Sequence, residues 1–116
     1  MAESRYLMLF RGGDGKHETL SPEESQQHMQ KWLNWINEMK NRDIYCGGSP
    51  LEDVGVVVNP DQTITDGPFT ESKELIGGYI VIEADSAKTA TEEAMNCPIL
   101  CMGGRVEVRR VVEMCE

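Results

Sequence analysis

The segment from Gly77 to Ala84 constrains the fold more than any other part of this chain. It contains four consecutive apolar residues, Tyr79-Ile80-Val81-Ile82. Because successive side chains of a strand point to opposite faces of a sheet, a strand formed here is apolar on both faces. The segment is therefore predicted to be a central strand of a sheet that is covered on both sides.

A second strand with the same character is predicted from about Arg5 to Arg11. Its apolar side chains alternate between two faces, with Tyr6, Met8 and Phe10 on one face and Leu7 and Leu9 on the other. Period-two alternation of this kind is typical of a strand. Two strands of the sheet therefore have apolar side chains on both faces, which other parts of the protein must bury.

Two helices are predicted, and each begins at a capping serine. Ser21-Pro22-Glu23-Glu24 opens the first helix, since serine caps free amides, proline suits the first helical position and Glu24 completes a capping box. This helix is predicted to extend to about Asn41. Ser86 caps the second helix, which is predicted to end near Asn96, before Cys97-Pro98.

The remaining predicted strands complete an α+β pattern. They are Ile44–Leu51, a hairpin of Val54–Val58 and Thr63–Thr65, and a last strand around Arg105–Val112. Asp66-Gly67-Pro68-Phe69 is predicted to break the hairpin, and a polar loop follows it. Without the hairpin the order is β-α-β-β-α-β, the pattern of a ferredoxin-like sandwich with two helices on one face of an antiparallel sheet.

Two helices leave the other face of such a sheet uncovered. A large exposed apolar patch is unusual on a monomer, so a second copy packing on this face is the simplest cover. The sequence thus predicts a single domain over residues 1–116 that forms a homodimer through the open face of its sheet.

Charge and composition argue against several classes of protein. The chain has 20 acidic and 11 basic residues and a formal charge of −9, whereas a nucleic-acid-binding protein usually presents a basic face. No run approaches the roughly 20 apolar residues of a membrane helix, and the first residues lack the pattern of a signal peptide. We expect a cytoplasmic protein that binds neither nucleic acid nor a membrane.

No cofactor or metal site is predicted. The glycine run at residues 12–15 lacks the G-K-[ST] ending of a phosphate loop. Cys97 and Cys101 form a single C-x-x-x-C, without the second pair of ligands that a structural zinc site needs. Free thiols are expected for the four cysteines in the cytoplasm. The arginines at 105, 109 and 110 form a local anion site or are solvated charges at a strand end.

The most specific motif is Asp66-Gly67-Pro68-Phe69-Thr70-Glu71-Ser72-Lys73-Glu74, followed by Gly77-Gly78-Tyr79. It resembles the signature of the YCII-related proteins, in the branch named after its D-G-P-F motif. The same family is similar to this chain at Ser21-Pro22-Glu23-Glu24, at Cys97-Pro98-Ile99-Leu100, and from Gly103 to Arg109. The resemblance covers nearly the whole chain in the right order.

The resemblance implies a ferredoxin-like fold and dimers of the α+β-barrel kind. Members of the wider superfamily have a proposed histidine–aspartate pair in a cleft, and a few relatives act as small lyases or dehydrohalogenases. The D-G-P-F branch is also associated with extracytoplasmic-function sigma factors, which implies a regulatory setting.

His28 and Asp66 are the candidate catalytic residues. Helical spacing places His28 on a stripe with Trp32 and Trp35, so its imidazole is expected to face the sheet, whereas His17 is expected to be exposed. On such a face His28 is either a satisfied core or cleft residue or an acid–base group. Asp66 is either a turn former before Gly-Pro or a carboxylate that orients a histidine.

Three further residues are candidates for binding a substrate. Trp32 lines an apolar pocket or packs in the core. Phe69 would anchor the motif loop in apolar surroundings. Lys73 binds an acidic substrate or belongs to a solvated loop.

Two functions from different classes fit this sequence. The first is a small cofactor-independent acid–base enzyme, lyase-like or hydrolase-like, in which His28 and Asp66 act on a small organic acid. The second is a non-catalytic module that senses a ligand or binds a regulatory partner, in the setting of a sigma factor. The sequence alone is consistent with both hypotheses.

Overall fold

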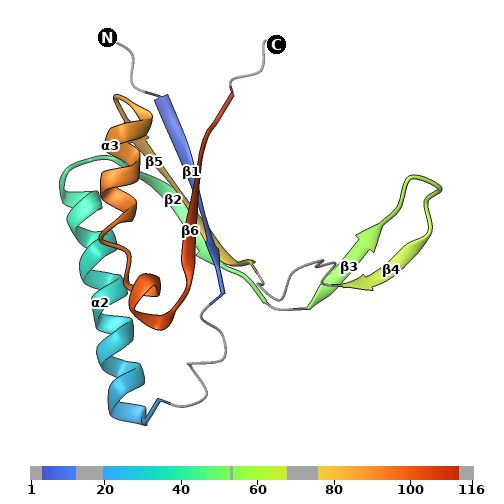
Figure 1. Cartoon of the computed structure of the whole chain (residues 1–116), viewed down its shortest axis with the longest axis horizontal. Helices are drawn as coiled ribbons and strands as arrows, with labels where there is room; N and C mark the ends of the chain where they lie inside the picture. The colour runs from blue at the N-terminus through green and yellow to red at the C-terminus, as the bar shows by residue number, and fades with distance from the viewer. Residues whose placement is uncertain (1–3, 13–19, 53, 68–75, 113–116) are drawn as a thin grey trace.

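The computed structural model describes residues 4–12, 20–52, 54–67 and 76–112. Its elements are β1 (Ser4–Arg11), α2 (Pro22–Asn41), β2 (Tyr45–Pro50), β3 (Gly55–Val58), β4 (Ile64–Gly67), β5 (Ile76–Ala84), α3 (Ala87–Ala94), the 3-10 helix η1 (Pro98–Met102) and β6 (Arg105–Arg110). Figure 1 shows α2 and α3 on one side of the sheet and the β3–β4 hairpin on the other.

Four strands form an antiparallel sheet in the order β2-β5-β1-β6, and β3 and β4 form a separate two-stranded sheet. The two central strands, β5 and β1, are those with apolar residues on both faces. A β-α-β-β-α-β chain with this strand order has the ferredoxin-like α+β fold, which confirms the predicted fold class.

The structure differs from the sequence prediction at the end of β4 and in the connection from the second helix to β6. Asp66 and Gly67 continue β4 instead of breaking it, because they pair with Val56 and Gly55. The predicted second helix already ends at Ala94, and the connection to β6 contains η1. Gly103 caps the C-terminus of this short helix, and its φ of 80° is a left-handed conformation that glycine adopts without strain.

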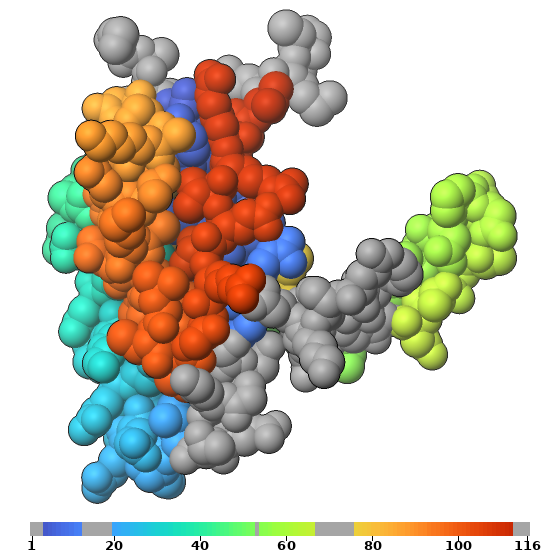
Figure 2. All heavy atoms as spheres, in the orientation of Figure 1, coloured from blue at the N-terminus to red at the C-terminus, as the bar shows by residue number. Residues whose placement is uncertain are grey.

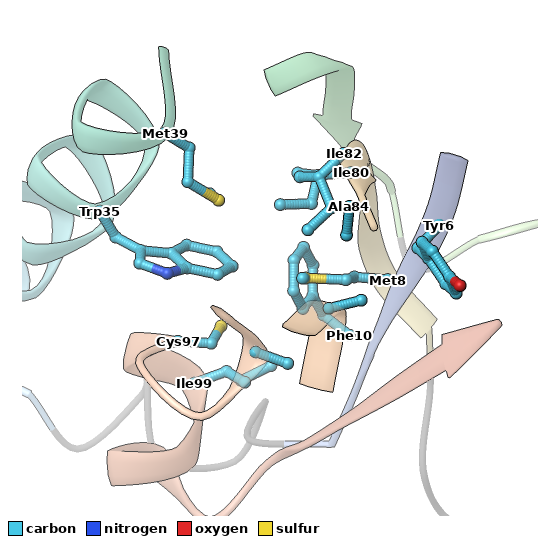
Figure 3. Close-up of a cluster of buried hydrophobic side chains, with 12 residues drawn as sticks. Tyr6, Met8, Phe10, Trp35, Met39, Ile80, Ile82, Ala84, Cys97 and Ile99 are labelled. Carbon is cyan, nitrogen blue, oxygen red and sulfur yellow. The ribbon is translucent and has the colours of Figure 1, made fainter. Parts of the chain in front are cut away.

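The core lies between the sheet and the two helices. In Figure 3 side chains from α2 and from the central strands point toward one another. The buried members are Tyr6, Met8, Phe10, Trp35, Met39, Ile80, Ile82, Ala84, Ala90, Ala94, Cys97 and Ile99. On the opposite face of the sheet Leu7, Leu9, Tyr79 and Val81 are half-buried. Both central strands are thus apolar on two faces, as their sequences predict.

The predicted capping box fixes the start of α2. The Ser21 hydroxyl accepts a hydrogen bond from the Glu24 amide at 3.1 Å, and the Ser21 amide donates to the Glu24 carboxylate at 3.0 Å. These bonds lower the pKa of Glu24. Satisfying the free amides in this way sets where the helix begins, and hence which residues face the sheet.

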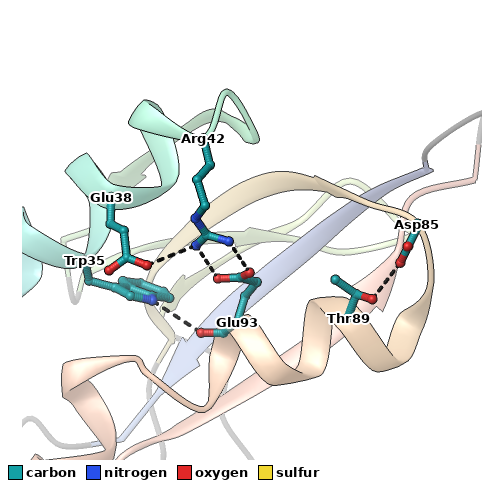
Figure 4. A network of polar contacts seen from close by, with 6 residues as sticks. All are labelled: Trp35, Glu38, Arg42, Asp85, Thr89 and Glu93. Carbon is teal, nitrogen blue, oxygen red and sulfur yellow. Dashed lines mark hydrogen bonds and ion pairs between the residues drawn. The ribbon is translucent and has the colours of Figure 1, made fainter.

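A network of polar contacts joins the end of α2 to α3 (Figure 4). The Arg42 guanidinium makes two bonds to the Glu93 carboxylate, at 2.6 and 2.7 Å. The Trp35 indole also donates to the Glu93 carbonyl oxygen at 3.3 Å. The hydrogen bonds from Arg42 lower the pKa of Glu93, although burial opposes the shift.

This network of polar contacts makes the free energy of unfolding depend on pH. Because the pKa of Glu93 is lower in the folded state, its contribution is present at neutral pH and is lost as pH falls through the folded pKa. Arg42 is 43% exposed, so solvent screens the pair, and Glu93→Gln is expected to lower the free energy of unfolding by about 1 kcal/mol at neutral pH.

Thermal unfolding at about pH 7 and about pH 3 measures this effect, because a carboxylate titrates between these values. Glu92→Gln is the matched control, since the neighbouring Glu92 is exposed on the same helix. A deficit for Glu93→Gln that is equally large at both pH values would show that the ion pair does not contribute.

Candidate active site

His28 lies in the first half of α2 and faces the sheet. Its side chain is buried, with a residue exposure of 8%, and within the described part of the chain it is the only buried polar residue. A buried polar side chain costs free energy unless it is hydrogen-bonded. The position of His28 therefore demands a specific hydrogen-bond partner.

Trp32, one turn later on α2, supplies a hydrogen bond to His28. The indole Nε1–H of Trp32 donates to Nε2 of His28 at 2.9 Å. Because an indole nitrogen is only a donor, the imidazole nitrogen that accepts must carry a lone pair. A neutral imidazole with its proton on Nδ1 satisfies this bond. Protonation of Nε2 would break the bond to Trp32.

An aromatic cluster holds Trp32 in place. The ring of Phe10 on β1 meets Trp32 edge to face, with centroids 5.0 Å apart and planes at 82°. Trp35 lies 6.1 Å from Phe10 and 5.7 Å from Trp32 in similar geometry. Edge-to-face pairs of this kind are favourable beyond the area they bury. Phe10 is buried, whereas Trp32 is half-exposed, so the cluster extends from the core to the surface.

Phe10 is a site residue that sequence reasoning missed. The alternation of β1 predicts that it points into the core, and the stripe of α2 predicts that Trp32 faces the sheet. Neither pattern fixes which strand residue meets which helix residue. That pairing depends on how α2 crosses the sheet, which local patterns do not encode.

The structure brings together only part of the predicted site. His28 and Trp32 are in contact, as above. Asp66 lies exposed on β4, paired with Val56, and Figure 1 shows its hairpin on the side of the sheet away from α2. Phe69 and Lys73, like His17, lie outside the described residues. The pairing of His28 with Asp66 stays a prediction.

The described cysteines are free thiols at positions 46, 97 and 101. Burial raises the pKa of Cys97 to about 12, so this thiol is protonated at neutral pH and is a poor nucleophile. Burial also raises the pKa of Cys46. Among residues that the structure describes, no group of three or more His, Cys, Asp or Glu side chains is placed to hold a metal ion.

Arg109 and Arg110 of the last strand have partners in the same chain. Glu107 accepts hydrogen bonds from Arg109 and, at 2.7 Å, from Arg11, and these bonds lower its pKa. Arg110 donates to the Ser4 hydroxyl at 3.3 Å. These contacts favour the interpretation of charges at a strand end over an anion site. No described helix combines the length and apolar character that crossing a bilayer requires.

The hydrogen bond from Trp32 predicts which nitrogen of His28 carries the proton. At neutral pH the wild-type ring is expected as the Nδ1–H tautomer, and Trp32→Phe is expected to let the proton move to Nε2. Long-range ¹H–¹⁵N correlation spectra of histidine distinguish the two tautomers. Trp35→Phe is the control, because its indole donates to the Glu93 carbonyl instead. Identical ¹⁵N shifts of His28 in wild type and Trp32→Phe would contradict the assignment.

Comparison with known proteins gives a family and a similar solved structure. The YCII-related domain matches residues 5–115. The structure of 5-chloro-2-hydroxyhydroquinone dehydrochlorinase from Burkholderia phenoliruptrix, in complex with 2,5-dihydroxybenzoquinone, is similar with a TM-score of 0.59 and 17% identity over 95% of each chain. At this identity the likeness shows a shared fold. No curated protein matches the sequence.

Proposed function

The chain belongs to the YCII-related family, and on this premise we propose that it is a small cofactor-independent enzyme in which His28 transfers a proton. The observation that carries the proposal is the hydrogen bond from Trp32 to Nε2 of His28. This bond favours the neutral form of a buried imidazole, and the neutral form is the one that can accept a proton.

The proposed substrate is a small organic acid with a flat ring or enol. Trp32 offers a half-exposed aromatic surface beside His28, and aromatic rings pack well against flat ligands. The similar dehydrochlorinase was solved with a dihydroxybenzoquinone, a compound of this shape. Phe69 and Lys73 are proposed to complete the binding site, with Lys73 facing the acidic group.

In the proposed step the Trp32 indole releases its hydrogen bond, and the substrate gives a proton to the freed lone pair on Nε2 of His28. The proton's bonding electron pair stays on the substrate. The imidazolium can no longer accept from Trp32, so the indole N–H becomes available to an anionic oxygen of the substrate. Donors directed at developing charge stabilise a transition state. Expulsion of an anionic leaving group with that electron pair completes an elimination, which is a lyase-like reaction, and His28 then releases its proton to water.

Asp66 is proposed to stabilise the imidazolium through its carboxylate. Within one chain the two residues lie on elements on opposite sides of the sheet (Figure 1), so this role needs a second subunit. The proposal therefore includes a cytoplasmic homodimer in which another copy covers Leu7, Leu9, Tyr79 and Val81 on the open face of the sheet.

Turnover of small ring acids tests the proposal. Hydroxyhydroquinones that carry a chloride leaving group are suitable substrates, with chloride release as the measurement. His28→Gln is expected to lower kcat/KM by at least about 100-fold, the usual contribution of an acid–base group, while the protein stays folded. His17→Gln, which replaces the other histidine, is expected to leave kcat/KM unchanged.

Two results would count against an enzyme that works through His28. If His28→Gln keeps the wild-type kcat/KM on a substrate that is turned over, another group transfers the proton. If 2,5-dihydroxybenzoquinone binds saturably but no compound is turned over, the ligand-sensing module becomes the better description.

A further inference from the structure

The outward side of α2 carries a regular row of exposed side chains, here called the seam. Its members follow one another at alternating spacings of three and four residues, and they are Glu23, Gln26, Gln30, Leu33, Asn37 and Lys40. Because a helix has 3.6 residues per turn, this spacing forms one stripe along it, here about 26 Å long. The buried residues of α2 lie on its other side, so the seam points away from the sheet.

The middle of the seam carries no charge, although the chain has a formal charge of −9. Gln26, Gln30 and Asn37 are amides, and Leu33 is 46% exposed beside Met29, which is 58% exposed. A helix face that only meets water usually carries charged residues, whereas the centre of a protein interface is depleted in them. The composition of the seam therefore favours contact with a protein.

A hollow on the same face has the geometry of a helix-packing site. Among the described residues it is lined by Glu23, Gln26, Gln27 and Gln30, and it is open to solvent. These residues occupy positions i, i+3, i+4 and i+7 of one helix. Four side chains in this arrangement form the hole that receives a side chain of a second helix in knobs-into-holes packing.

Charge identifies a second copy of this chain, packed antiparallel, as the occupant. The ends of the seam carry opposite charges, with Glu23 in the first turn of α2 and Lys40 in its last turn. When two seams cross antiparallel about the midpoint between Gln30 and Leu33, each Glu23 lies opposite Lys40 of the other copy. A parallel pair would instead bring like charges together, which is repulsive.

The amides of the seam suit the same arrangement. An amide side chain both donates and accepts hydrogen bonds, so a stripe of amides is complementary to a second copy of itself, as a two-fold contact requires. In the antiparallel pair Gln26 lies opposite Asn37 of the other copy, which brings Asn37 to the hollow.

Two contacts already order side chains at the centre and at one end of the seam. The Gln30 amide donates to the Asn34 side-chain oxygen at 2.8 Å, and the Lys40 ammonium lies 5.4 Å from the centroid of the Tyr45 ring. Side chains that are ordered before binding lose less conformational entropy when a complex forms.

We propose that two copies of this chain associate through their seams, as an antiparallel pair of α2 helices. The contact is one helix pair with mostly polar side chains, so it belongs to the weak interfaces, which bury less than about 1,200 Å². Figure 2 shows the first half of α2, in blue and cyan, at the outer edge of the molecule. Neither the open face of the sheet nor His28 takes part, so the proposal is independent of the proposed function.

Cross-linking tests the antiparallel register. Glu23 and Lys40 lie about 26 Å apart along one helix, so a zero-length carbodiimide cannot join them within a chain. In a concentrated mixture of ¹⁴N and ¹⁵N chains, mass spectrometry is expected to find an amide between Glu23 and Lys40 that joins a light peptide to a heavy one.

Lys31 is the control for the cross-link, because it is exposed on the same helix but lies outside the seam. Few Glu23–Lys31 cross-links are expected. If the Glu23–Lys40 cross-link is absent, or if cross-links to Lys31 are equally frequent, the antiparallel pair is wrong.

Charge reversal tests whether the seam contributes to association. Lys40→Glu places carboxylates opposite each other at both ends of the helix pair, and it is expected to weaken self-association about tenfold in sedimentation velocity over a concentration series. Glu23→Lys/Lys40→Glu exchanges the two charges and is expected to restore the wild-type affinity, since each pair again has opposite signs.

Lys31→Glu changes the net charge by the same amount outside the seam and is expected to leave the affinity near that of the wild type. Circular dichroism checks that each variant remains folded. An association that Lys40→Glu leaves unchanged, or a double variant as weak as Lys40→Glu, would overturn the proposal.

Discussion

The edge-to-face packing of Phe10 against Trp32 and Trp35 joins a central strand to α2, and the candidate site depends on it. Phe10 is fixed by pairing with Gly78 on one side and Val106 on the other. Its ring in turn limits where the indole of Trp32 can lie, and that indole donates a hydrogen bond to Nε2 of His28. A change in how α2 crosses the sheet would therefore move the imidazole of His28, because side-chain contacts link the strand, Trp32 and His28.

His28 is a polar residue at a position of α2 where the sequence pattern would otherwise place an apolar residue. Its neighbours on the same stripe of α2, Trp35 and Met39, are buried apolar residues, and a leucine at position 28 would suit the pattern equally well. Burying an imidazole instead costs desolvation, which the hydrogen bond from Trp32 offsets. Proteins tend to break a local rule of this kind where function requires it. This argument, and not the mere presence of a histidine, separates His28 from an ordinary core residue.

The features of the fold that local sequence patterns determine were predicted correctly. The alternation of Tyr6, Met8 and Phe10 and the capping serine before Pro22 are local signals, and the structure bears them out. Asp66 shows the limit, because its preference for a turn is local whereas its pairing with Val56 is set by the opposite strand. The hydrogen bond between Trp32 and His28 also escaped prediction. Helical spacing brings the two residues to one stripe, but the side-chain rotamers that join their rings follow from packing.

His28 and Asp66 belong to elements on opposite sides of the sheet, α2 and the β3–β4 hairpin (Figure 1). A ferredoxin-like sheet with two helices satisfies only one of its faces, and the hairpin adds the exposed side chains of Val56, Val58 and Ile64 without adding a core. The hairpin projects on the side of the sheet that the helices leave open (Figure 1). Because a large exposed apolar surface is unusual on a monomer, the open sheet face and the hairpin together favour an association on this side of the molecule.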